Sequence, residues 1–304
     1  MIMSTPTTTS TYTCPYCRIP SDGTSATCPH CGAPVDVRER VSRSGWAEQP
    51  PIRDMARIRF NRSTCQISGL YVPVAEMNLH PEDWVYFSHH VLLHTDRSVQ
   101  LDTMKMRGGW NRVLAGMPLV MMTARGPGFI AFSADHPGET LAVPLQHNQA
   151  VDVVEHRFLV ATGNVNFHWE NTGVWFQTQT RTNDGTETET HYPLGRTMDR
   201  FWAQGGPGLL LLHGPGNTFI RDLAPGERIC VQPSSLIWKD PTVQMWLHFE
   251  YPRGQYWFSS ARWQAKTVWL TLQGPGRVAV QSVFERPETV GQVTNCSSAT
   301  TQQW

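Results

Sequence analysis

The sequence predicts an all-β protein with an internally duplicated β domain, preceded by a small zinc ribbon. Its 304 residues include 24 Gly, 22 Pro and 12 Trp, but only 16% are charged. This composition favours strands joined by tight turns over long helices. Many short apolar segments alternate with a period of two, as half-buried strands do. Four cysteines near the N-terminus have the spacing of a metal-binding ribbon.

The four cysteines form two Cys-x-x-Cys pairs, Cys14 with Cys17 and Cys28 with Cys31. Each pair places two thiolates on one tight turn, and the ten residues between the pairs allow the turns to face each other. Four sulfurs at roughly 2.3 Å would then enclose one tetrahedral Zn²⁺ and leave no position for a substrate, which predicts a structural site. Disulfides and another metal are the open alternatives. Gly32 suits the turn that closes the second knuckle, because glycine reaches positive φ without strain.

The chain divides into five predicted segments. They are a disordered tail (1–12), the zinc ribbon (13–34), a linker (35–55), the duplicated β domain (56–287) and a second disordered tail (288–304). The linker lacks apolar periodicity, and the last segment is rich in Ser, Thr and Gln. Within the β domain, the clearest alternating segments are 129–132, 140–143, 151–154, 244–249 and 277–281. One short helix is expected near 109–115.

A repeated phrase indicates duplication inside the β domain. Gly-Pro-Gly occurs at 126–128, 206–208 and 274–276, each time before an apolar segment. Pro-Gly-Glu occurs at 137–139 and again at 225–227. The order of Gly-Pro-Gly turn, strand, Pro-Gly-Glu turn and strand therefore occurs twice, and the Gly-Pro-Gly at 274–276 indicates the start of a final copy.

Much of the β domain resembles the altered-inheritance-of-mitochondria (mitochondrial biogenesis) family. The segments that carry the resemblance are Pro81–Ser88, Gly108–Gly116, Gly126–Gly128, His136–Glu139, Arg157–Val165 and Leu272–Ser282. The resemblance implies a fold like that of the trp RNA-binding attenuation protein, in which two related β units interlock as a barrel-like double-stranded β-helix, often in a trimer. The ribbon lies outside this resemblance and is similar to the zinc ribbons fused to many bacterial proteins.

The histidines and cysteines of the β domain do not assemble a recognisable catalytic motif. The chain contains 12 His but no His-x-His. His89 and His90 are adjacent, so on a strand they would point to opposite faces. There is no Gly-x-Ser-x-Gly elbow, and Cys65 and Cys230 lie in apolar segments that favour the neutral thiol.

The carboxylates and the glycine-rich turns give no stronger signal for catalysis. Asp152 and Glu155 are predicted to face outward from a strand. The Gly-Pro-Gly turns lead into strands, so they lack the helix amides that bind phosphate. We therefore predict no catalytic and no cofactor-binding residues, and we expect that the protein is not an enzyme.

The charge balance argues against nucleic acid as the main partner. Lys and Arg total 25 and Asp and Glu total 25. The chain therefore has no excess of positive charge with which to bind a phosphate backbone. Nucleic-acid binding through the ribbon and the β-barrel surface, with a local cluster at Arg57, Arg59 and Arg62, is nevertheless kept as an alternative. Membrane association, implied by mitochondrial relatives, is a second alternative, although no basic amphipathic helix or lipidation motif supports it.

The remaining function class is a non-enzymatic scaffold. Protein partners are expected through the ribbon, and a homo-oligomer, favoured as a trimer, is expected through the β domain. No apolar stretch approaches the roughly 18 to 20 residues that cross a bilayer, and residues 1–13 lack the regions of a secretory signal. Because thiolate ligands need a reducing compartment, we expect a cytoplasmic, bacterial protein.

Overall fold

The regular structure of the described residues is almost entirely β-strand. The computed structural model describes residues 12–14, 17–21, 27–32, 46–48, 58–69, 71–104, 121–182, 185–250, 267–285, 292–297 and 299–300. In these residues the regular structure is strands and two short 3-10 helices, η3 (His89–Val91) and η4 (Pro233–Ser235). The predicted all-β class is therefore confirmed. The helix expected near 109–115 lies outside the described residues.

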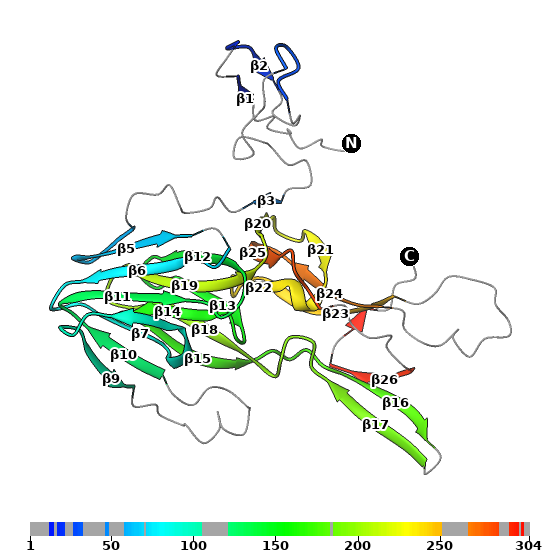
Figure 1. The fold of residues 1–304 in the computed structure, drawn as a ribbon. Coiled ribbons are helices and arrows are strands. Elements are labelled where there is room, and N and C mark those ends of the chain that lie inside the picture. The colour runs from blue at the N-terminus through cyan, green and yellow to red at the C-terminus, as the bar shows by residue number, and fades with distance from the viewer. Residues whose placement is uncertain are drawn as a thin grey trace.

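The β domain consists of three copies of a six-stranded unit (Figure 1). The first unit comprises β6 (Val74–Leu79), β7 (Trp84–Ser88), β8 (Leu92–Thr95), β9 (Gln100–Thr103), β10 (Met121–Arg125) and β11 (Gly128–Ser133). The second comprises β12 (Gly138–Leu145), β13 (Ala150–Val154), β14 (Phe158–Thr162), β15 (Val165–Asn171), β18 (Thr197–Ala203) and β19 (Gly208–Pro215). The third comprises β20 (Thr218–Leu223), β21 (Arg228–Val231), β22 (Leu236–Lys239), β23 (Gln244–Glu250), β24 (Thr267–Gln273) and β25 (Gly276–Gln281).

Each unit has the topology of a small double-stranded β-helix. Its sixth strand pairs with the first and third strands, and its fifth strand pairs with the second and fourth. Strands one to four therefore alternate between two half-sheets, and an apolar core fills the space between them. The double-stranded β-helix implied by the family resemblance is present three times in this chain.

The predicted duplication is corrected to a triplication. The Gly-Pro-Gly turns at 126–128, 206–208 and 274–276 each precede the sixth strand of a unit, so they are equivalent. The Pro-Gly-Glu segments are not: residues 137–139 lie at the start of the second unit, whereas 225–227 connect the first two strands of the third unit. The two Pro-Gly-Glu segments look alike because both are turns, and tight turns favour proline and glycine at any position in the topology.

Matching hydrogen bonds support the alignment of the first and third units. Asp96 and Phe129 exchange backbone and carboxylate bonds: the Asp96 amide donates to the Phe129 carbonyl at 2.8 Å, and the Phe129 amide donates to the Asp96 carboxylate at 2.9 Å. Asp240 and Arg277 repeat both bonds with the same two lengths. The same turn therefore precedes the fourth strand in both units.

The units are joined edge to edge by antiparallel strand pairs. β14 of the second unit pairs with β7 of the first, and β22 of the third unit pairs with β13 of the second. These joints create two continuous sheets, ordered β12-β19-β14-β7-β10-β9 and β15-β18-β13-β22-β25-β20-β3. Figure 1 shows the first unit at one end of the body and the third unit at the other.

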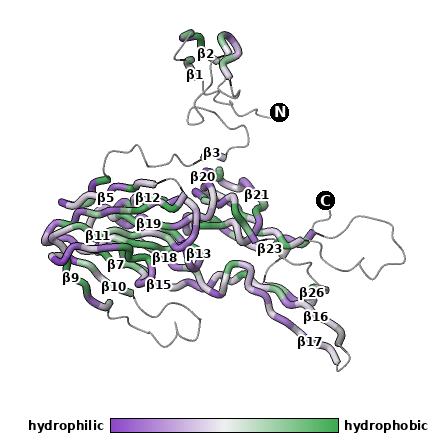
Figure 2. Tube along the Cα trace, in the orientation of Figure 1, coloured by the Kyte–Doolittle hydropathy of each residue, from purple (hydrophilic) through white to green (hydrophobic). Residues whose placement is uncertain are grey.

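The apolar core consists of three main clusters, one in each unit. Aromatic contacts within the second cluster span the first two units: Tyr86 of β7 stacks on Phe158 of β14 with ring centroids 5.5 Å apart, and Phe158 stacks on Phe201 at 5.1 Å. In Figure 2 the hydrophobic segments follow central strands such as β13 and β19, whereas the protruding β17 (Gly185–His191) is mostly hydrophilic. Burial on both faces explains why the central strands are nearly continuous apolar runs.

Parts of the predicted linker and C-terminal tail are strands. Within the linker (35–55), β3 (Ala47–Glu48) pairs with β20. Within the tail (288–304), β26 (Gln292–Cys296) pairs with β16 (Phe176–Thr182), and β27 (Ala299–Thr300) pairs with β23. The disorder predicted for the tail is wrong at β26 and β27. They are polar in composition, but sheet edges hold them through backbone hydrogen bonds, which do not depend on side-chain polarity.

Candidate functional site

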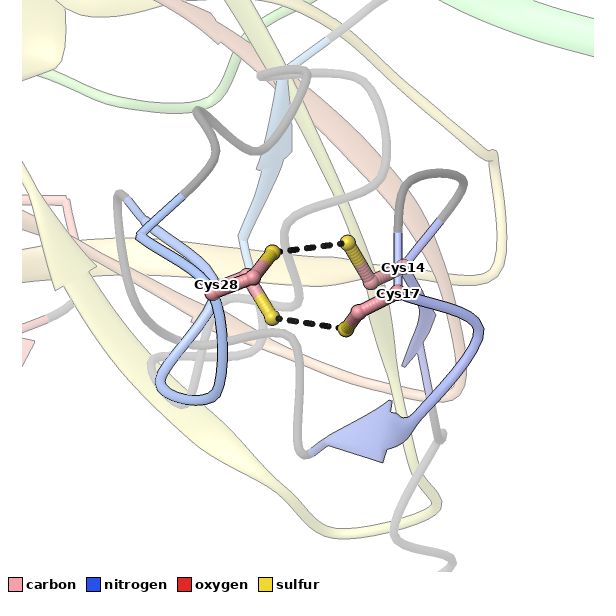
Figure 3. A group of neighbouring side chains, drawn as sticks. Cys14, Cys17 and Cys28 are labelled. Carbon is pink, nitrogen blue, oxygen red and sulfur yellow. Dashed lines mark hydrogen bonds between the residues drawn. The ribbon is translucent and has the colours of Figure 1, made fainter.

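The four predicted metal ligands lie together near the N-terminus (Figure 3). A short hairpin of β1 (Tyr12–Thr13) and β2 (Pro20–Ser21) carries the first pair. The Sγ atoms of Cys14 and Cys31 are 3.7 Å apart, and those of Cys17 and Cys28 are also 3.7 Å apart. All four Sγ atoms lie within 4.8 Å of one another. The two Cys-x-x-Cys turns therefore face each other, as their spacing predicts.

The sulfur positions fit a single tetrahedral ion. Zn–S bonds of about 2.3 Å at tetrahedral angles give S–S edges of roughly 3.8 Å, close to the observed separations. A disulfide would require about 2.05 Å, and all seven cysteines of the chain are free thiols. The four thiolates can thus hold a metal ion, and a tetrahedral set of four sulfurs is typical of zinc and of iron–sulfur sites.

The two turns of the ribbon have the same backbone geometry. The Cys14 carbonyl accepts a hydrogen bond from the Arg18 amide at 2.8 Å, and the Cys28 carbonyl accepts one from the Gly32 amide at 2.9 Å. Arg18 and Gly32 both have positive φ, 60° and 72°. The positive φ expected for Gly32 is confirmed. The sequence did not predict the positive φ of Arg18, because a non-glycine residue rarely takes this conformation.

A cavity of about 640 Å³ lies between the first and second units. Residues from both units line it, among them Ser88, His90, Met121, Arg157, Phe158 and His213. Loops that follow the second strand of each of these units, and those that connect successive units, form its walls. No local pattern in the sequence indicates this cavity, because its lining residues come from segments up to 195 residues apart (88 to 283).

His213 is the most deeply buried ionisable group of the cavity. Its side chain lies on β19 and only 5% of the residue surface is exposed. Neither ring nitrogen has a hydrogen-bond partner in the described part of the chain. Burial and the nearby charge of Arg157 lower the pKa of His213 to about 4, so the imidazole is neutral at pH 7.

Arg157 lies next to His213, because the His213 amide donates to the Arg157 carbonyl at 2.8 Å. Its Nε is buried and has no hydrogen-bond partner among the described residues. Burial lowers the pKa of Arg157, and the charge of Glu285 opposes this effect. No ion pair of this guanidinium occurs within the described residues.

The acidic groups of the cavity wall already have partners within the chain. The Glu155 carboxylate accepts hydrogen bonds from the amide and hydroxyl of Thr197 at 3.0 and 2.5 Å. Asp135 pairs with His136 at 2.6 Å. Asp199 also interacts within the chain. The Arg157 Nε and both ring nitrogens of His213 are buried atoms of lining residues that have no hydrogen-bond partner in the described structure.

Asp152 does not face outward as predicted. It is 3% exposed, and its carboxylate binds Arg200 through two hydrogen bonds of 2.6 and 3.0 Å and Lys239 through one of 2.9 Å. The prediction is wrong because β13 is a central strand with both faces buried, so a single polar residue between valines marks a buried ion pair. Glu155 is half-buried instead of outward-facing.

Three other sequence-based expectations are tested. His89 and His90 lie on η3, so the strand argument for their opposite directions does not apply. Cys65 is fully buried, and burial raises the pKa of its thiol to about 12, which confirms the neutral form. Cys230 is exposed, so its predicted apolar surroundings are wrong.

Comparison with known proteins identifies a family and shows a likeness to solved structures. The model of the mitochondrial biogenesis AIM24 family matches residues 65–283. The chain is similar in fold to the crystal structure of a Streptococcus pyogenes protein, with a TM-score of 0.51, 17% sequence identity and coverage of 73% of this chain and 94% of that chain. No curated protein matches the sequence. Among the described residues, no helix has the length and apolarity that a membrane span requires.

Proposed function

The chain belongs to the mitochondrial biogenesis AIM24 family, and from this premise we propose that it is a non-enzymatic scaffold. In this proposal the β domain assembles into a homo-oligomer, favoured as a trimer, and the zinc ribbon recruits protein partners. The unpaired edges of two strands, β8 and β21, are the observation that carries the proposal.

The two joints inside the chain follow one rule. In each joint, the third strand of one unit pairs with the second strand of the preceding unit: β14 with β7, and β22 with β13. By the same rule, β8 of the first unit would pair with β21 of the third. β8 and β21 instead end their sheets, and neither has a partner on its outer edge among the described residues. A matching pair of edges is therefore available at the two ends of the chain.

Leu93 supports this pairing because its equivalents are buried across a joint. All three third strands have a bulge at the same position, occupied by Leu93 in β8, Leu159 in β14 and Ile237 in β22. Leu159 packs into the core of the first unit, and Ile237 packs into that of the second. They are 4% and 0% exposed, whereas Leu93 is 55% exposed. A strand paired with the free edge of β8 would cover the exposed side chain of Leu93.

Cys230 gives the same contrast on the other edge. Its equivalents in the second strands are Tyr86 and Asp152, which are 1% and 3% exposed and lie in the two joints. Cys230 itself is exposed. Because β8 and β21 belong to opposite ends of the chain, their pairing between chains is head-to-tail, and it closes into a ring or extends as a filament. A ring of three chains is the form that the family resemblance favours.

Light scattering of the purified chain tests the scaffold proposal. We expect an oligomer that persists after deletion of residues 1–45, since the ribbon takes no part in the edge pairing. Leu93→Lys should yield a monomer with an unchanged circular dichroism spectrum, because a charged side chain at a free edge opposes pairing. Leu101→Lys, at an exposed leucine on β9, is the matched control and should stay oligomeric. A monomeric parent chain would reject the proposal.

The ribbon is proposed to bind protein rather than nucleic acid. Three arginines of the β domain, Arg200, Arg221 and Arg277, are ion-paired with carboxylates, which reduces the positive charge available to phosphates. A protein partner should stay bound at moderate salt, whereas nucleic-acid binding would weaken steeply. Thiolate ligands need a reducing compartment, so we place this role in the cytoplasm. Membrane association remains the second alternative, and the family name alone supports it.

A further inference from the structure

The cavity between the first and second units has no role in the scaffold proposal, yet it has the features of a ligand site. Its volume of about 640 Å³ lies within the range of roughly 300 to 1,000 Å³ that small-molecule sites occupy. Such sites combine an apolar wall with a few convergent polar groups. Both components are present in this cavity.

The polar component consists of His213 and Arg157. His213 is 5% exposed and both of its ring nitrogens lack a partner within the described residues. Burying an unpaired polar group costs about 1 to 3 kcal/mol, so native proteins usually satisfy it with a bonded group. The Arg157 Nε is likewise buried and without a partner in the described chain. The Arg157 Nε–H and the one N–H of the neutral His213 ring are therefore two adjacent donors that line one cavity without an acceptor.

The guanidinium of Arg157 makes a carboxylate a suitable missing acceptor. Glu155 and Asp135 accept hydrogen bonds from Thr197 and His136, and Asp199 also interacts within the chain. The guanidinium of Arg157 forms no ion pair with these carboxylates among the described residues, although the charge of Glu285 acts on it. A carboxylate of the ligand would supply the ion-pair partner that Arg157 lacks.

The apolar component is a rigid wall made by Met121 and Phe158. Met121 is 4% exposed. Phe158 is held between Tyr86 and Phe201, with ring centroids 5.5 and 5.1 Å away. Fixed side chains of this kind favour an apolar ligand body, because little side-chain entropy is lost when it binds.

We propose that this cavity binds a small organic monocarboxylate. Its carboxylate accepts hydrogen bonds from Arg157 and His213, and its apolar body packs against Met121 and Phe158. Inorganic phosphate has the charge but no apolar body, and an alcohol of the same chain length has the body but no charge. Phosphate therefore tests whether the ligand needs an apolar body, and the alcohol tests whether it needs a negative charge.

Isothermal titration calorimetry of the full-length protein tests the site, with sodium octanoate, octanol and inorganic phosphate as probes. Octanoate should bind at least about tenfold more tightly than octanol or phosphate, because a charge-assisted hydrogen bond contributes roughly 1.5 to 3 kcal/mol. Arg157→Gln should weaken octanoate binding by about tenfold or more. Arg62→Gln is the matched control: Arg62 is exposed and pairs with Glu82 at 3.1 Å outside the cavity, so its loss should leave octanoate affinity unchanged.

His213→Gln provides a second arm, with the exposed His147→Gln as its control. We expect weaker octanoate binding only in the first. Circular dichroism shows whether each variant is folded; if Arg157→Gln is not, Arg157→Lys replaces it and should bind octanoate more weakly than the parent while keeping its preference over octanol. Failure of the parent to bind octanoate up to about 10 mM, or equal affinity for octanoate and octanol, overturns the proposal. Neither outcome bears on the oligomer, which does not involve this cavity.

Discussion

Lys239 and Asp152 form an ion pair across the joint between the second and third units. Lys239 Nζ lies 2.9 Å from the Asp152 carboxylate, and the two residues are direct partners in β22 and β13. Their side chains are only 7% and 5% exposed. Arg200 shares the same carboxylate and extends the network to Glu170 at 2.8 Å. A one-residue slip of the joint would leave these charges buried without partners, so the network specifies its register.

Asp152→Ala should destabilise the β domain strongly. It leaves Lys239 buried without its counter-charge, a change that typically costs about 3 to 5 kcal/mol. Lys239→Met should cost less, because Arg200 still neutralises Asp152 and the methionine fills most of the lysine stem. Urea denaturation followed by tryptophan fluorescence measures both values. Equal losses for the two variants would contradict the shared-carboxylate arrangement.

Acid should weaken the same network. Burial alone would raise the pKa of Asp152, but Arg200 and Lys239 hold it below its ordinary value. The stabilisation is therefore complete above the unfolded pKa of about 3.9 and is lost as the pH falls through the lower folded value. In urea denaturation between pH 5 and pH 2, Asp152→Asn should show a flatter dependence on pH than the parent. An identical slope in both proteins would exclude Asp152 as the titrating group.

Local sequence signals predicted the local structure well. The spacing of Cys14, Cys17, Cys28 and Cys31 is sufficient to bring four sulfurs together, because each pair is confined to one turn. Alternating apolar segments likewise predict strands, since side chains on a strand alternate between its faces.

Non-local structure was not predictable from the same signals. The buried state of Asp152 depends on Lys239, 87 residues away, and no local pattern indicates that pairing. The cavity donors Arg157 and His213 become neighbours only through the pairing of β14 with β19. The sequence did not predict three complete β units. The Pro-Gly-Glu segment of the third unit has the same residues as the one that begins the second unit, although the two lie at different positions in the topology.

His213 should make the protein sensitive to mild acid. Its folded pKa of about 4 lies below the ordinary value of 6.5, so the unfolded chain binds a proton that the folded chain excludes. Stability then falls as the pH drops from about 6.5 towards 4, by up to about 3 kcal/mol. His213→Gln should remove this part of the loss, whereas His147→Gln should retain it. Urea denaturation at pH 7.5 and pH 5 measures the difference, and a parent-like loss in His213→Gln would refute this assignment.

The ribbon should respond asymmetrically to substitutions at its two positive-φ positions. Gly32→Val forces a β-branched residue into a left-handed conformation and should weaken zinc binding about tenfold. Arg18→Gly removes a residue that is already strained there, so its affinity should stay within about threefold of the parent. Competition of the full-length protein with a chromogenic chelator measures both affinities. A larger loss in Arg18→Gly than in Gly32→Val would contradict the equivalence of the two turns.

Removal of the metal should unfold the ribbon and leave the β domain intact. Zinc contributes about 10 to 16 kcal/mol to ribbons of this kind, whereas the three apolar clusters of the β domain contain no metal ligand set among the described residues. With chelator, proteolysis should cut within the first forty residues, and the circular dichroism of the β domain should persist. Collapse of the whole spectrum would mean that the two parts do not fold independently. If elemental analysis finds no zinc in the purified protein, the premise that the ribbon binds zinc is wrong.

A disulfide can test the register of the proposed contact between chains. By analogy with the pairs Ala161–Tyr86 and Lys239–Asp152, Thr95 of one chain should lie opposite Cys230 of the next. Directly opposed residues of antiparallel strands have Cα atoms about 4.5 to 5.5 Å apart, which a disulfide can span. Thr95→Cys should therefore form covalent oligomers on mild oxidation.

The head-to-tail arrangement predicts the pattern of these products. Each chain carries both edges, so denaturing gels should show species larger than a dimer, and a three-chain ring would end the series at the trimer. Cys230→Ser in the Thr95→Cys background should abolish the products, and Thr103→Cys, on β9 away from the joint, should form none. Products that persist without Cys230 would come from another cysteine, and a series that stopped at the dimer would indicate a two-fold interface in place of the head-to-tail contact.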